Sequence, residues 1–103
     1  NEQPKNINLT AKIQTECGEK IAFYIGIHEN KTIESIKFEN KGSQLISHCA
    51  NLICKTLANS KITNPIDTEK NIWQTIEIKL IGSRKEIIKK IIKDLIDQIQ
   101  NFS

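Results

Sequence analysis

The chain has little of several residue types on which whole classes of function depend. Its 103 residues include one arginine, five aromatic side chains and no methionine, and the net charge is only +3. Dedicated nucleic-acid-binding proteins usually cluster arginine and carry aromatic side chains on which bases stack. Lysine, isoleucine and asparagine are abundant along the whole chain, so the lysine content reflects a general bias. A nucleic-acid partner is therefore not expected.

Cysteine is scarce and odd in number, comprising Cys17, Cys49 and Cys54. A secreted protein held together by disulfides favours an even count, whereas free thiols are usual in a reducing compartment. No apolar run approaches the ~20 residues that a membrane-spanning helix needs. Residues 1–10 are polar and lack the apolar segment of a secretion signal. We expect a cytoplasmic protein without a membrane partner.

Three segments of the N-terminal half alternate apolar and polar side chains, which is the period of a strand with one buried face. They are residues 7–13, 20–28 and 32–39. Short polar turns separate them, and strands joined in this way form antiparallel hairpins. The pattern predicts a three-stranded antiparallel meander.

Two later segments repeat apolar residues at helical spacing. The first covers residues 43–59 and follows Gly42 and Ser43, which suit a loop and an N-cap; its stripe is Ile46, Ala50, Ile53 and Leu57. The second begins at Ser83 and Glu86, a pair with the spacing of a capping box. Its stripe is Ile87, Ile88, Ile91, Ile92, Leu95, Ile96 and Ile99.

The region between these helices divides into two parts. Residues 59–71 are rich in turn-forming side chains and contain Pro65, which indicates a loop. Residues 72–80 alternate again, which indicates a fourth strand. Grouped strands followed by helices argue for the α+β class. We predict one domain over residues 1–103, with a three- or four-stranded, mainly antiparallel sheet and two helices on one face, in the order β-β-β-α-β-α.

Most chemically versatile side chains have a structural interpretation. Cys49 and Cys54 lie ~140° apart around one predicted helix, so they are poorly placed to bind one ion, and cysteine is among the most buried residue types. His28 and His48 are isolated in the sequence. No nucleophile–base pair, paired carboxylates or glycine-rich phosphate loop can be assembled from the spacing. An enzyme is therefore the least supported class of function.

The last predicted helix carries a basic stripe of Lys85, Lys89 and Lys93, with Lys90 beside it. Basic stripes can bind phosphate groups, and such binding falls steeply as salt rises. Acidic residues are interspersed on the same helix, which is typical of a solvated outer face. A phosphate or nucleic-acid binder is therefore an alternative that ranks below the others.

Cys17 is the remaining candidate. It precedes Gly18, whose lack of a Cβ lets a metal approach closely, and it lies between Glu16 and Glu19. Neighbouring carboxylates disfavour an unligated thiolate, but a metal deprotonates the thiol that coordinates it. The residues alone leave two interpretations open, a metal ligand and a small apolar residue at a turn.

A Cys-Gly-Glu turn at residues 17–19, a hairpin over residues 21–39 and a Gly42-Ser43 turn before a helix follow one another in the sequence. In this order residues 16–63 resemble the central part of the NifU/IscU family of iron–sulfur cluster assembly scaffolds, which has a Cys-Gly-Asp turn, a hairpin and a Gly-Cys turn. The TSCPD domain, found on some ribonucleotide reductases and as short stand-alone proteins, is similar over the same residues.

The chain departs from the NifU/IscU pattern in its ligands. The family holds a cluster with three cysteines, whereas here Ser43 replaces the second and residues 72–103 contain no third. The family also has further helices where a strand is expected here. Glu19 in place of aspartate is a milder change.

The resemblance implies a scaffold with a reduced or lost metal site at Cys17 and Glu19, for an iron–sulfur cluster, iron or zinc. The scaffold would act through protein partners, and a homodimer would combine the thiolates of two Cys17 turns. The rival hypothesis is a non-catalytic interaction module that binds no metal, in which Cys17 is structural.

Overall fold

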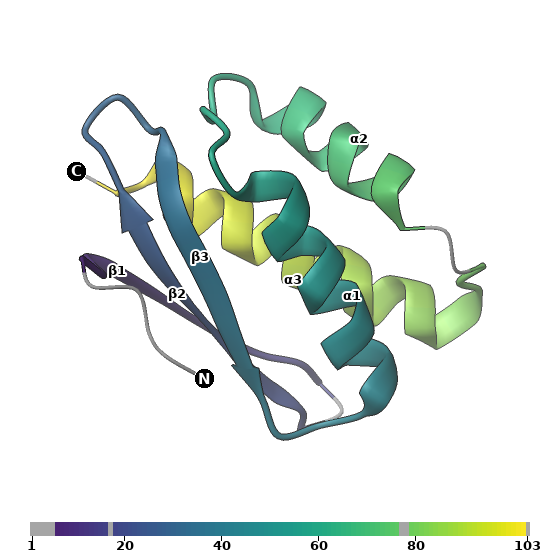
Figure 1. Cartoon of the computed structure of the whole chain (residues 1–103). Coiled ribbons are helices and arrows are strands. Elements are labelled where there is room, and N and C mark those ends of the chain that lie inside the picture. Colours follow the sequence, from purple (N-terminus) through teal and green to yellow (C-terminus); the bar gives the residue numbers. More distant parts are fainter. Residues whose placement is uncertain (1–5, 17, 77–78, 103) are drawn as a thin grey trace.

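The computed structural model describes residues 6–16, 18–76 and 79–102. Six elements follow one another along the chain: β1 (Leu9–Gln14), β2 (Lys20–Ile27), β3 (Ile33–Asn40), α1 (Gln44–Leu57), α2 (Pro65–Thr75) and α3 (Gly82–Gln100) (Figure 1). The three strands form one antiparallel sheet in the order β1-β2-β3. The predicted meander and the α+β class are therefore confirmed.

The strand register separates two faces of the sheet. Phe23 of the central strand lies between Ala11 and Phe38, on the face that is turned toward the core. A bulge interrupts the pairing of β2 with β3 at Gly26. A Cβ at that position would lie 2.8 Å from Ser35 Oγ, so glycine allows the two strands to approach here.

The helices cover one face of the sheet in two layers (Figure 1). α1 packs against β3 and α3 packs against β1, so these two helices form the first layer. α2 packs against both α1 and α3 on the side away from the strands. The predicted stripes of α1 and α3 are buried between the layers, with Ile87 only partly so. None of the helices in the described part of the chain is long and apolar enough to span a membrane.

The helix α2 corrects the prediction for the middle of the chain. Residues 65–71, expected in a loop, and residues 72–75, expected in a strand, are all helical. Ile76, Lys79 and Leu80 have no regular structure, and residues 77–78 lie outside the described part of the chain. Within that part the sheet has three strands, and three helices accompany it instead of two.

Local chemistry at its N-terminus explains why this segment is helical. The side chain of Asn64 accepts hydrogen bonds from the backbone N–H groups of Ile66 (2.9 Å) and Asp67 (3.3 Å). Pro65 occupies the first helical position, where a missing N–H costs nothing and the fixed φ suits the helix. The Asn-Pro pair therefore begins a helix, although the same pair also starts turns.

The start of α3 also differs from the prediction. The helix begins at Gly82 after Ile81, and no side chain caps it. Ser83 lies within the first turn, so the expected capping box between Ser83 and Glu86 is not formed. The opposite end of α3 is closed by Lys31 of the β2–β3 hairpin, whose Nζ donates to the carbonyls of Ile99 (3.0 Å) and Phe102.

Candidate functional site

The turn that contains the first site prediction joins β1 to β2. It is closed by backbone hydrogen bonds from Thr15 N to Glu19 O (2.9 Å) and from Gly18 N to Thr15 O (3.0 Å). Gly18 has φ +86°, a left-handed conformation that glycine adopts at little cost. Cys17 lies outside the described residues, and Glu19 is half-buried at the end of the turn.

Glu19 joins this turn to the start of α1. Its Oε1 accepts a hydrogen bond from the backbone N–H of Ser43 at 3.0 Å, across 24 positions of sequence. Ser43 is the N-cap of α1, as predicted, and its Oγ accepts from the N–H of Ile46 at 3.3 Å. A carboxylate is favoured here because unpaired N–H groups and the helix dipole make this end of a helix positive.

The β3–α1 turn is shaped to receive that carboxylate. The side chain of Asn40 stabilises this turn, because it accepts a hydrogen bond from Gly42 N (2.9 Å) and donates one to Ser43 O (3.1 Å). A Cβ at position 42 would lie 2.9 Å from Glu19 Oε1, so glycine leaves the necessary space. We refer to the hydrogen bond between Glu19 and Ser43, with the two turns that it joins, as the Glu19–Ser43 contact.

A depression of about 210 Å³ adjoins this contact. Glu19, Ser43 and Arg84 contribute its polar side chains, and its apolar lining is Leu45, Ile46, Ile87 and Ile88. Arg84 is exposed on the first turn of α3. Sequence reasoning missed this arginine, because its place beside Glu19 depends on how α3 packs near the start of α1.

The sequence did contain a sign that the two turns of the Glu19–Ser43 contact lie close together, namely the predicted order of the strands. In a three-stranded meander, the turn after the first strand and the end of the third strand lie at the same end of the sheet. The two turns on which the family resemblance rests, at residues 17–19 and at Gly42 and Ser43, were therefore bound to be neighbours once the meander was predicted.

The two cysteines of α1 belong to the core, as predicted. Cys49 is fully buried and Cys54 is 9% exposed. Burial raises the pKa of the Cys54 thiol to about 12 and also raises the pKa of the Cys49 thiol. Both thiols are therefore protonated at neutral pH, whereas metal coordination requires a thiolate. His28 and His48 are exposed.

The described residues do not by themselves form a metal site. Over residues 6–16, 18–76 and 79–102, no three histidine, cysteine, aspartate or glutamate side chains gather closely enough to hold an ion. Glu19 already uses one oxygen in the contact with Ser43, which leaves its second oxygen as a possible metal ligand. An iron–sulfur cluster normally takes four ligands, so Cys17 and Glu19 of one chain do not fit a complete cluster site.

The basic stripe of α3 lies on the outside of the molecule. Lys85, Lys89, Lys90 and Lys93 are all exposed. Lys90 forms an ion pair with Asp94 at 3.5 Å, with both side chains accessible to solvent. This arrangement agrees with the solvated outer face favoured by the sequence.

Comparisons with known proteins give no family assignment. No protein-family model matches the chain, and no curated protein matches it.

Proposed function

We propose that this protein is a scaffold of the NifU/IscU type with a reduced site. Cys17 and Glu19 bind iron, zinc or a cluster as a transient cargo, and the protein transfers the cargo to protein partners in a reducing compartment. The main support is the Glu19–Ser43 contact, because the two turns that resemble the family's ligand-bearing turns meet at one end of the sheet.

The helical content of the C-terminal half gives further support. The family has additional helices after the one that follows its Gly-Cys turn. A strand at residues 72–80 would have separated this chain from that pattern, but α2 and α3 both follow α1. The departures that remain concern the ligands, namely Ser43 and the missing third cysteine.

The donor set suits a cargo that leaves easily. The Cys17 thiolate supplies one strong ligand and the second oxygen of Glu19 supplies a weaker one. The remaining ligands have to come from solvent, from a second copy of the chain or from the acceptor protein. An acceptor with its own thiolates would complete the coordination and remove the metal, so transfer is favoured over storage.

The alternative is an interaction module that binds no metal. It is favoured by the same hydrogen bond, because bonding to the N-terminus of α1 gives Glu19 a sufficient structural role. In that case Cys17 is only a small side chain in a tight turn. The two functions differ in whether Cys17 retains metal.

The test is anaerobic loading of the protein with iron and sulfide, and separately with zinc, followed by metal analysis and a visible spectrum. The native chain should retain metal, and Cys17→Ser should lose it while its circular dichroism stays unchanged. Cys54→Ala is the matched control, because it removes a thiol that the fold buries. Equal retention by Cys17→Ser and the native chain, or no retention by either, would refute the scaffold function.

A further inference from the structure

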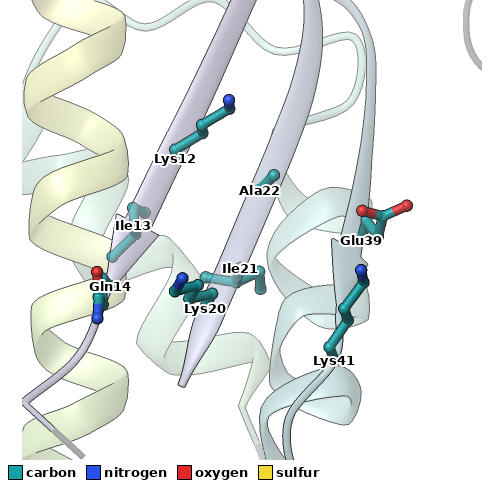
Figure 2. Close-up of a pocket in the computed structure, with 8 residues that line it drawn as sticks. All are labelled: Lys12, Ile13, Gln14, Lys20, Ile21, Ala22, Glu39 and Lys41. Carbon is teal, nitrogen blue, oxygen red and sulfur yellow. The ribbon is translucent and has the colours of Figure 1, made fainter. Parts of the chain in front are cut away.

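The face of the sheet opposite the helices carries a second depression, of about 440 Å³ (Figure 2). It is lined by residues of all three strands and of the turn after β3: Lys12, Ile13, Gln14, Lys20, Ile21, Ala22, Glu39 and Lys41. Figure 2 shows Lys12, Lys20 and Lys41 around the small side chain of Ala22, with Glu39 at one side. We call this feature the open-face depression.

The strand register explains why the surface is hollow here. Ala22 of the central strand pairs with Lys12 on one side and with Glu39 on the other. A methyl group therefore lies between two long side chains. The volume is within the range of ordinary ligand pockets, but an open hollow on a sheet surrounds its occupant less than a cleft does.

The lysines of the open-face depression are arranged unfavourably for the isolated chain. Ile21 pairs with Asn40, the last residue of β3, and continuing this register by one position would bring Lys20 and Lys41, which both line the depression, opposite each other. Lys12 is a diagonal neighbour of Lys20, because it pairs with Ala22. Like charges placed opposite each other on a sheet are destabilising.

Within the described part of the chain this repulsion is offset only in part. None of the three ammonium groups forms an ion pair with a residue in that part. Glu39 is the one carboxylate of the lining, which leaves an excess of two positive charges. A local arrangement of charges that destabilises the fold and makes no compensating contact is typical of a binding site.

We propose that the open-face depression binds an acidic segment of a partner protein, with an apolar side chain seated over Ala22 and carboxylates beside Lys12, Lys20 and Lys41. Charge complementarity selects an acidic occupant. The apolar floor and the carboxylate of Glu39 favour a segment of mixed acidic and apolar residues over a continuous run of phosphates.

The position of the open-face depression gives such a partner access to the candidate site. Lys20 follows Glu19 directly and Lys41 precedes Gly42, so the bound segment would lie next to the Glu19–Ser43 contact. The proposal does not depend on the scaffold function, because metal retention rests on Cys17 whereas peptide binding rests on the lysines.

The test is titration of the ¹⁵N-labelled full chain with a short synthetic peptide of alternating glutamate and leucine, with a glutamine-for-glutamate peptide as a control. Amide shifts should concentrate at Lys12, Lys20, Ala22 and Lys41. The double variant Lys12→Gln/Lys20→Gln should bind the acidic peptide about tenfold more weakly. The matched variant Lys89→Gln/Lys93→Gln removes the same charge from the exposed face of α3 and should stay within about twofold of the native chain.

Ala22→Glu is a second variant. It fills the floor of the depression with a side chain of the same charge as the acidic peptide, and it should abolish peptide binding. Equal weakening in the two double variants, shifts located elsewhere, or absence of binding would each overturn the proposal. Stronger binding of an oligonucleotide of the same charge would overturn it as well. The two proposals are tested separately: the lysine double variant should lose peptide binding and retain metal, and Cys17→Ser should lose metal and retain peptide binding.

Discussion

Glu19 combines a structural role with a candidate functional one. One oxygen accepts a hydrogen bond from Ser43 at the N-terminus of α1, and Cys17, the other candidate ligand, precedes Glu19 by two positions in the sequence. The sequence predicted Ser43 as the N-cap and Glu19 as a candidate ligand. The predicted meander places their turns at the same end of the sheet, but it does not predict that the two residues are bonded, because a strand pattern does not specify contacts between a side chain and the backbone.

Removing the Glu19 carboxylate should destabilise the fold. Glu19→Ala leaves the N–H of Ser43 without its acceptor, so we expect the free energy of unfolding to fall by about 1 kcal/mol. Glu16→Ala, at an exposed position of the same turn, is the control and should change it little. Urea denaturation measures both, and equal effects in the two variants would contradict the structural role of Glu19.

Among the elements, periodicity predicted the strands and two of the three helices because each buries a continuous apolar stripe. α2 was missed because its buried side is short: only Thr68 and Ile72 are buried, and Ile66 is 77% exposed. With so weak an apolar stripe, the turn-forming residues of its first half and the alternation that begins at Ile72 dominated the sequence pattern. The start of the helix is specified by Asn64 and Pro65 instead.

The N-cap of α2 should therefore contribute measurably to stability. Asn64→Ala removes the acceptor for two backbone N–H groups and should lower the free energy of unfolding by about 1 kcal/mol. Asn64→Asp retains a capping oxygen and should stay near the native value. Thermal and urea denaturation test this. A cap without effect would mean that packing against α1 and α3 alone determines this helix.

The whole molecule is built in layers, with the sheet on one side and the helices on the other. The helices bury one face of the sheet, and the open-face depression lies on the opposite face. The meander brings the β1–β2 turn and the β3–α1 turn to one end of the sheet (Figure 1). The fold class followed from the sequence. The two depressions did not, because each is formed by side chains that only tertiary packing brings together.

The central claim is that this chain carries metal at Cys17. The most direct measurement is the mass of the natively folded protein after anaerobic loading, recorded by native mass spectrometry for the native chain and for Cys17→Ser. The account predicts a mass increase matching zinc, iron or an iron–sulfur cluster, on a monomer or on a dimer, that Cys17→Ser abolishes. An apo mass for the loaded native chain, or the same increase in both proteins, would contradict it.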